Sequence, residues 1–212
     1  MKRNYQLQEP RQLSQAELNY RLAYHEAGHA VAIHLYNQQQ QLPAIFFQIT
    51  LNDFNQFYRD SLSATIQGGC LIQNLPSSFM SFQQDMTAEE KQAYFVAMEA
   101  DMINLLSGAI AEAYYVSLKD GELLNSQLFN LDSLDYYGGC SDKIKIQQYL
   151  YYLNLIFASQ AQCQRLQALI ERAFNFITNN KQWQAVIKVA EFILQTEKPL
   201  IHCEELFNLI DN

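Results

Sequence analysis

The sequence has few cysteines, few basic residues and no long apolar run, and each shortage excludes a class of protein. Its four cysteines, Cys70, Cys140, Cys163 and Cys203, never form a CxxC pair, which argues against zinc ribbons and dithiol redox sites and favours reduced, mostly buried thiols. Lysine and arginine total 14 against 22 aspartates and glutamates, so we expect no nucleic acid or anionic membrane surface as a partner. No apolar stretch reaches the roughly 18 residues that span a bilayer, and the N-terminus lacks the apolar segment of a secretory signal. These absences predict a cytoplasmic protein without a transmembrane segment.

What is present is enough apolar material for one sizeable domain. The chain has 212 residues, 49% of them hydrophobic, which supports an ample core. We expect a single domain over residues 1–212, with an N-terminal extension at 1–13, a metal-site core at 14–160 and C-terminal helices at 161–212.

The most informative segment is an HExxH motif, His25 to His29, inside a stretch that the apolar period predicts to be helical from about residue 16 to 36. Residues four apart lie on one helix face, so both histidines can bind one zinc ion. Glu26 can then accept a proton from a water whose pKa the zinc lowers, which is the chemistry of peptide hydrolysis. The alternative is a helical domain without metal, because short motifs also arise by chance.

Gly28, between the two histidines, strengthens the metal interpretation. Glycine inside a helix costs about 1 kcal/mol relative to alanine. We therefore expect another part of the chain to approach the helix backbone closely at this point.

The rest of the chain predicts a mainly α fold with a small β-sheet or hairpin after the motif helix. Apolar and polar residues alternate around residues 45–51 and 62–66, which predicts two strands. A capping box at Thr87 to Glu90 opens a long helix that we expect to end near Ser117. A long loop at 119–139 should follow, then a helix after Asp142, helices at 162–179 and 182–196, and a short helix after His202.

A catalytic zinc site needs a third protein ligand. His34 lies too far round the motif helix to share the face of the two histidines. Glu99, followed by Asp101, would serve in a thermolysin-like arrangement. Asp142 follows two glycines and a serine at an expected helix start, although an acidic residue there is more often a plain helix-terminal charge. The residues alone leave this choice open.

Three segments resemble the protease domain of FtsH-type ATP-dependent zinc proteases. Residues 22–31, LAYHEAGHAV, are similar to the zinc-binding helix of that family, which reads AYHEAGHA. Residues 105–112, LLSGAIAE, are similar to its LLGGRxAEE segment, and residues 138–142, GGCSD, to its GASND segment. Weaker similarity continues through 170–206, so the resemblance covers about residues 14–210.

The resemblance implies an FtsH-protease-domain-like fold, His25, His29 and Asp142 as the zinc ligands, and Glu26 as the catalytic base. It also implies an edge strand between residues 45 and 66 that holds an extended, unfolded or flexible peptide for cleavage. The resemblance also implies one of two assemblies. One is a hexamer of this chain, and the other is a complex with a separate FtsH-type ATPase that delivers substrate and attaches the protein peripherally to a membrane.

The chain departs from the family at several places. The residues before His25 contain no GxxxxGK[ST] loop, so we expect the chain not to hydrolyse ATP by that route. Ala109 and Ala113 replace the family's arginine and second glutamate, and the Gly-Tyr-Thr substrate strand is missing from residues 45–69. Cys140, close to Asp142, we interpret as a small buried bystander rather than a rival ligand or oxidation switch.

We therefore expect a stand-alone zinc metalloendopeptidase. The alternative within the resemblance is a catalytically idle pseudoprotease that acts as a binding or regulatory subunit. Retention of Glu26 argues for the enzyme, and loss of the substrate strand argues for the pseudoprotease.

Overall fold

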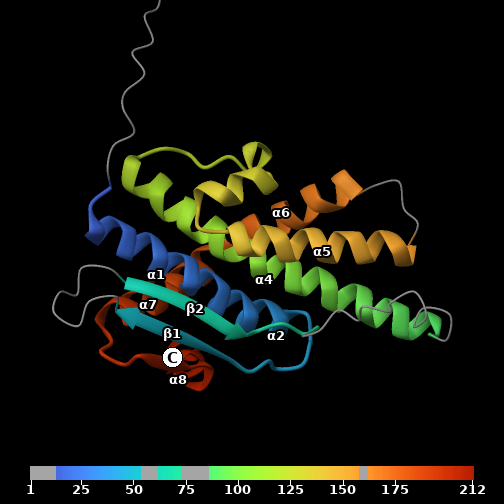
Figure 1. The fold of residues 1–212 in the computed structure, drawn as a ribbon, viewed down its shortest axis with the longest axis horizontal. Helices are drawn as coiled ribbons and strands as arrows, with labels where there is room; N and C mark the ends of the chain where they lie inside the picture. Colours follow the sequence, from blue (N-terminus) through green and yellow to red (C-terminus); the bar gives the residue numbers. More distant parts are fainter. Residues whose placement is uncertain (1–12, 54–61, 73–85, 158–161) are drawn as a thin grey trace, which may run out of the picture.

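A computed structural model describes residues 13–53, 62–72, 86–157 and 162–212. Within these residues the protein is mainly helical with one small antiparallel sheet, as the sequence predicts. The elements follow in the order α1 (Gln15–Val31), the π-helical turn η1 (Ala32–Tyr36), α2 (Asn37–Gln39), β1 (Phe47–Asp53), β2 (Leu62–Gly68), α4 (Ala88–Asp120), the 3-10 turns η2 (Ser126–Leu128) and η3 (Leu131–Tyr136), α5 (Cys140–Phe157), α6 (Gln162–Thr178), α7 (Asn180–Gln195), β3 (Leu200–His202) and α8 (Cys203–Asp211) (Figure 1).

The motif helix α1 begins at Ser14, whose side chain accepts a hydrogen bond from the backbone N–H of Glu17. Such a cap satisfies one of the free N–H groups at a helix start. The helix continues without a break into the π-helical turn η1, so the helical run predicted for residues 16–36 is confirmed. A π-helical turn inside a helix is rare and is frequently found near functional sites.

The long helix α4 begins at the predicted capping box, with Thr87 and Glu90 bonded reciprocally. It ends at Gly121, which adopts the left-handed conformation typical of a helix end. Its expected apolar side is buried, with Met98, Met102 and Leu106 fully enclosed. The same helix also buries five polar residues that its apolar pattern does not predict: Asp101, Asn104, Ser107, Glu112 and Ser117.

Helix α4 also has the length and composition of a membrane-crossing segment, as no other helix among the described residues does. In this structure 67% of its most apolar stretch is buried inside the protein. A buried core helix can have the same length and apolar composition as a membrane-spanning one. The expected absence of a transmembrane segment therefore stays a prediction.

The sheet has the strand order β2-β1-β3, with both pairs antiparallel. Ile49 of β1 faces Ile66 on one side and Ile201 on the other. The predicted alternation in β1 is confirmed, because Phe47 and Ile49 are buried while Phe46 is exposed. Strand β3 is not predicted by the sequence pattern. It pairs with the free side of β1, so that β2 lies at one edge of the sheet and β3 at the other.

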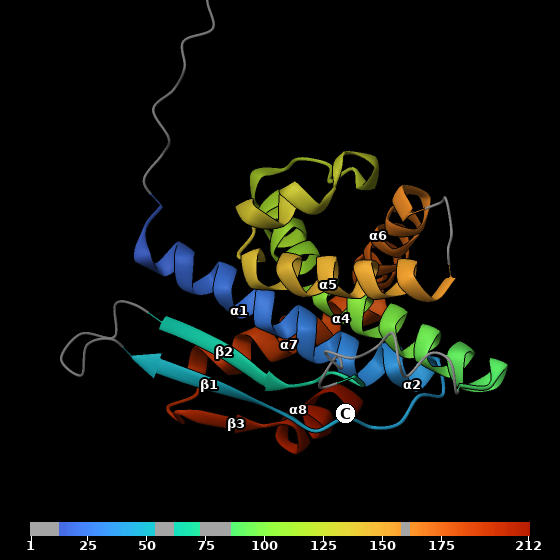
Figure 2. The same ribbon diagram turned by 45° about the vertical axis from the view of Figure 1, so that its right-hand side comes forward.

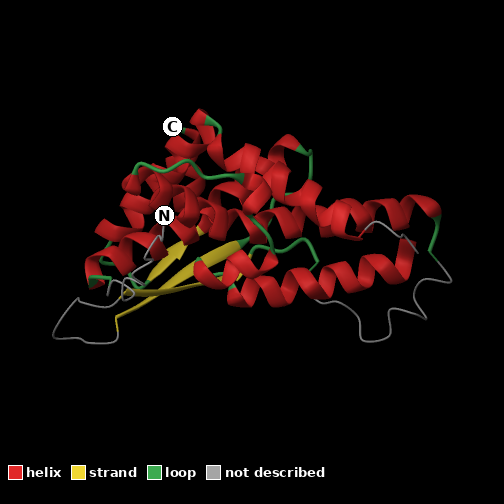
Figure 3. Cartoon of the chain, turned by 90° about the horizontal axis from the view of Figure 1, so that it is seen from above, coloured by secondary structure: helices red, strands yellow, loops and turns green. Residues whose placement is uncertain are grey.

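Helix α1 lies at the centre of the molecule. It packs against α4, α7 and β2, so that the sheet covers one side of the helix and α4 and α7 cover others (Figures 1 and 2). Seen from above, the strands occupy one half of the length of the molecule, and the helices extend well beyond them (Figure 3). The two histidines of the motif, on this helix, are both buried.

The segment predicted as a loop at 119–139 is shorter and more ordered than expected. Helix α4 continues to Asp120, and η2 and η3 lie within the remainder. Lys143 of α5 reaches back to η3 and binds Asp132 at 2.8 Å and Asp135 at 2.7 Å. The connection is thus tied to the helix that follows it.

Candidate metal centre

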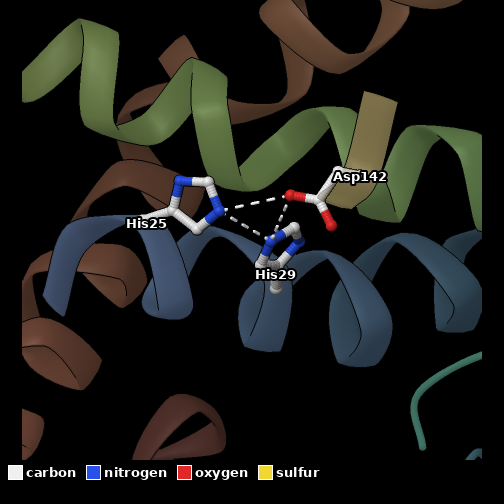
Figure 4. Close-up of side chains that lie close together, drawn as sticks. All are labelled: His25, His29 and Asp142. Carbon is white, nitrogen blue, oxygen red and sulfur yellow. Dashed lines mark hydrogen bonds and ion pairs between the residues drawn. The ribbon is translucent and has the colours of Figure 1, made fainter. Parts of the chain in front are cut away.

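Three side chains from distant parts of the sequence meet in the interior. His25 and His29 project from one face of α1, and Asp142 comes from the first turn of α5 (Figure 4). The two histidine Nε2 atoms are 3.1 Å apart, and Asp142 Oδ2 lies 3.3 Å from each of them. Among the described residues, these three form the one group of histidine, cysteine or carboxylate ligands that could hold a metal ion.

The triangle has the dimensions of a zinc site. Ligand atoms about 2.0–2.1 Å from a tetrahedral zinc ion lie about 3.3 Å from one another. The observed separations of 3.1, 3.3 and 3.3 Å fit that geometry. Two imidazoles and one carboxylate leave a fourth position open, which is the arrangement of catalytic rather than structural zinc. The same donors also suit other divalent transition metals.

The orientation of the His29 ring is fixed by α4. Its Nδ1 lies 2.8 Å from the backbone carbonyl oxygen of Asn104. A carbonyl can only accept, so Nδ1 carries the hydrogen and Nε2 presents a lone pair to the ligand triangle. A Cβ atom on Gly108 would lie 2.3 Å from that Nε2. The ring therefore fits only because residue 108 has no side chain.

The ring of His25 is oriented by a second carboxylate, from Glu112 of α4. His25 Nδ1 lies 3.3 Å from Glu112 Oε2, and both side chains are less than one tenth exposed. Gly138 lies beside the same pair, because a Cβ atom there would be 3.2 Å from Glu112 Oε2 and 3.3 Å from His25 Nδ1. Carboxylates in this position raise the basicity of a ligating histidine and hold its ring. The similarity to the LLGGRxAEE segment includes Glu112 but gives it no role.

The histidines and carboxylates of the site shift one another's pKa values. Burial alone would lower the pKa of His25, but Asp142 and Glu112 outweigh it and raise the pKa to about 10. For Asp142, burial would raise the pKa, and the two histidines instead hold it far below its usual value. The metal-free site thus favours a protonated His25 beside an ionised Asp142, and a divalent cation would replace that proton.

Glu26 is buried beside the ligands and lines the same cavity, which has a volume of about 350 Å³. Burial raises its pKa, and His25 and His29 partly oppose the shift. A carboxylate with a raised pKa is a better proton acceptor than an exposed one at neutral pH. Glu26 therefore lines one cavity with the three ligand residues.

One wall of the cavity is the edge strand. Ala64, Thr65, Ile66 and Gly68 of β2 line it, together with Gly69. Within the described part of the chain, strand β2 pairs with β1 and with no other strand. Its other side carries backbone groups that an added peptide strand can bond. Strand β2 is thus the candidate for the substrate-holding edge expected between residues 45 and 66, and that role stays a prediction.

The other candidate ligands lie elsewhere. His34 pairs with Asp211 at 2.8 Å and stacks on Phe207 of α8. Glu99 forms an ion pair with Arg172 of α6, also at 2.8 Å. Neither side chain lines the cavity at the histidines.

Cys140 differs from its expected burial. It is exposed at the start of α5, and only Cys203 among the described free cysteines is buried. The expectation of a small buried bystander is therefore wrong about the environment of this thiol. Cys140 does not belong to the ligand group found among the described residues.

The expectation for Gly28 is confirmed. A Cβ atom there would lie 2.4 Å from the carbonyl oxygen of Ser107 and 2.6 Å from the Cβ of Ala111. Helices α1 and α4 thus cross in backbone contact at the motif, which brings Asn104 and Glu112 within reach of the two histidines.

No protein-family model matches the chain, and no curated protein matches it either. The resemblance to FtsH-type proteases stays a prediction from three sequence segments. We therefore infer a function from the geometry of the site.

Proposed function

We propose that the protein is a zinc-dependent metalloendopeptidase, with the fold of an FtsH-type protease domain, that cuts unfolded or flexible protein segments. His25, His29 and Asp142 would hold the zinc, and Glu26 would be the general base. The FtsH-like fold is part of the proposal. The mainly helical architecture with a small sheet after the motif helix supports it.

The observation that carries the proposal is the convergence of the ligand atoms beside Glu26. Asp142 is 117 residues from His25 in the sequence, yet its Oδ2 lies 3.3 Å from both histidine nitrogens. A buried cluster of this kind is costly unless its charges are paired or bind a metal. A pair of half-buried structural histidines would need neither the aspartate nor a second buried glutamate next to them.

The residues have separable tasks in such a reaction. Zinc, when bound, supplies a Lewis acid that polarises the scissile carbonyl and lowers the pKa of the attacking water. Glu26 accepts the proton of that water and returns it to the leaving amine. Asn104 and Glu112 hold the two imidazole rings, and β2 aligns an extended substrate by backbone hydrogen bonds.

Degradation of casein, an unfolded protein, by the zinc-loaded chain without ATP tests the proposal. We expect cleavage by the wild type and a loss of about 10²–10⁴-fold in Glu26→Gln, which keeps the ligands but removes the base. Glu122→Gln is the matched control, because it changes an exposed carboxylate outside the cavity. It should cut as the wild type does.

A silent wild type that still binds one zinc ion per chain would contradict autonomous activity. Adding an FtsH-type ATPase then separates two possibilities. Restored cleavage would indicate a peptidase that depends on a partner, or on a hexamer, for substrate delivery. Continued silence would favour the binding or regulatory subunit.

A further inference from the structure

Asp101 of α4 is a buried carboxylate that takes no part in the ligand triangle. It is 1% exposed. Its Oδ1 accepts a hydrogen bond from the backbone N–H of Leu71 at 2.7 Å, and its Oδ2 accepts one from Ile72 at 2.9 Å. The hydroxyl of Tyr149 on α5 also reaches Oδ2 at 2.9 Å. Every one of these bonds is assisted by the charge of the carboxylate.

The segment that Asp101 holds is the continuation of the edge strand. Strand β2 ends at Gly68, and Gly69 and Cys70 then line the cavity before the chain reaches Leu71. Gly69 has φ +78°, and a Cβ atom there would lie 2.7 Å from Ile33 Cδ1 of η1. The turn formed by residues 69–72 thus packs against η1 at Gly69 and is hydrogen-bonded to Asp101 at Leu71 and Ile72.

Tyr149 closes the arrangement. Its hydroxyl lies 3.1 Å from the carbonyl oxygen of Ile72 as well as 2.9 Å from Asp101. The single hydroxyl hydrogen is shared between these two acceptors, so Ile72 is bonded to α4 through its N–H and to α5 through its carbonyl oxygen. The same two helices carry Glu112 and Asp142 of the metal centre. The position of the turn is therefore fixed relative to the metal centre.

We propose that Asp101 is a positioning residue for substrate: by holding Leu71 and Ile72 it fixes the end of β2 against the metal centre, so that an added peptide strand lies in register with the ligands. This inference rests on the proposed peptidase function. Asp101 acts through the backbone of the turn and does not itself contact the reacting atoms.

The carboxylate is ionised at neutral pH but close to its titration range. Burial raises the pKa of Asp101 to about 6, against the opposing effect of the bonds from Ile72, Leu71 and Tyr149 and the charge of Lys145. Lys145 and Tyr149 face it from α5, and the Cys70 thiol faces it from the turn. Protonation converts one acceptor oxygen into a donor and leaves a backbone N–H without its partner.

Asp101→Asn tests the proposal, because the amide keeps the size of the side chain but replaces one acceptor oxygen with a donor. Hydrogen exchange over residues 69–72 should accelerate by about tenfold, since a charge-assisted hydrogen bond is lost. In the zinc-loaded enzyme the KM for a casein-derived peptide should rise by about tenfold with kcat within about twofold, as expected for lost binding alone. Tyr149→Phe leaves the two N–H bonds to Asp101 but removes the hydroxyl next to the Ile72 carbonyl, and it should give about a threefold change in each measurement.

Glu99→Gln is the matched control. It makes the same carboxylate-to-amide change two residues away on α4, where Glu99 pairs with Arg172 outside the cavity. It should leave exchange, KM and kcat unchanged. Zinc content and thermal unfolding of every variant show whether a loss comes from a damaged fold.

A further arm separates this inference from the proposed function. Binding of fluorescein-labelled casein to zinc-loaded Glu26→Gln, with and without Asp101→Asn, needs no turnover. If no variant cuts casein but Asp101→Asn accelerates exchange and weakens binding about tenfold, the catalytic proposal fails and the positioning role stands. If the wild type cuts and Asp101→Asn leaves exchange, binding and KM within twofold, Asp101 is only a buried structural acid and the inference is overturned. It is overturned as well if Tyr149→Phe has no effect and Asp101→Asn does no more than lower thermal stability.

Discussion

At the scale of single residues, the metal centre depends on side chains that are missing. Gly28 allows α4 to touch the backbone of the motif helix, and Gly108 leaves room for the His29 ring. Close packing makes such contacts intolerant of even one added carbon atom. The ligand positions are therefore set as much by these two glycines as by the ligands.

Gly108→Ala should damage the site more than its small size suggests. The new Cβ would lie 2.3 Å from His29 Nε2, so the ring must move away from the ligand triangle. We expect loss of stoichiometric zinc binding and a loss of about 1–3 kcal/mol in stability from overpacking. Zinc titration and denaturant unfolding measure the two effects.

The matched glycine control is Gly121→Ala. A Cβ atom there has nothing within 4 Å, although φ is +69°. Only the cost of a left-handed alanine should appear, about 1 kcal/mol, with zinc binding intact. Equal zinc affinity in both variants would contradict the steric argument.

Glu112→Gln should weaken zinc binding without removing a ligand. The amide no longer raises the basicity of His25, whose Nδ1 lies 3.3 Å from the carboxylate. Loss of such a partner typically costs 10–100-fold in metal affinity. Competition with a chromogenic chelator measures the affinity, and NMR titrations of the two metal-free proteins should show a lower pKa for His25 in the variant than in the wild type, because Glu112 helps to raise it. An unchanged affinity would mean that Gly138 and Asp142 suffice to hold the ring.

At the scale of elements, local patterns predict most of what the structure shows. The 3.6-residue period predicts α1, alternation predicts β1, and a capping box predicts the start of α4. Strand β3 could not be predicted, because Leu200–His202 is too short for an alternating pattern to stand out and a helix follows it directly.

Contacts between elements are the part that the residues alone could not supply. Helical period places Asp101 and Glu112 on α4 but does not say that both are buried beside other polar groups. By its sequence position alone, Asp142 is one of several candidate ligands, and only the family resemblance singles it out. In the fold, the crossing of α1 and α4 at Gly28 and the docking of α5 decide which acidic residues meet the histidines.

The connection between α4 and α5 gives a prediction at this scale. Lys143 binds Asp132 and Asp135 of η3, and the charge-assisted bonds raise the pKa of the lysine and lower that of Asp135. Lys143→Gln should release η3, so chymotrypsin should cut near Tyr136 severalfold faster. Added salt should accelerate cleavage of the wild type in the same way, because exposed ion pairs are screened.

Lys188→Gln, an exposed lysine on α7, is the control for this experiment. Its cleavage rate should match that of the wild type. If Lys143→Gln is also cut at the wild-type rate, η3 is held by its apolar contacts, such as that of Leu134, which is fully buried.

At the scale of the whole molecule, zinc joins α1 to α5 and should stabilise the entire fold. A ligand that binds only the folded state adds about 4 kcal/mol at a thousandfold excess over Kd, or about 8–16 °C in Tm for a chain of this size. Treatment with EDTA should lower Tm by that amount, measured by calorimetry. His29→Ala should show no change on the same treatment.

The effect of zinc should grow with pH. In the metal-free protein the pKa of His25 is raised from 6.5 to about 10. Its stabilising effect is therefore complete below about pH 6.5 and declines as the pH rises towards 10. Zinc replaces the proton, so its affinity should increase over the same range. We expect the difference in Tm between zinc-loaded and EDTA-treated protein to widen from pH 6.5 to pH 9, and a constant difference would contradict the protonation of His25.

The sheet has a consequence for the birth of the protein on the ribosome. Strand β1 ends at Asp53, and its second neighbour β3 begins only at Leu200. Translation at about 5–20 residues per second would leave one side of β1 without its partner for roughly seven to thirty seconds. During that time the nascent chain presents an open strand edge, which other chains can join. The last strand to leave the ribosome, β3, is thus the one that covers the second side of β1. A chaperone that binds β1 would protect the nascent chain from aggregation until then.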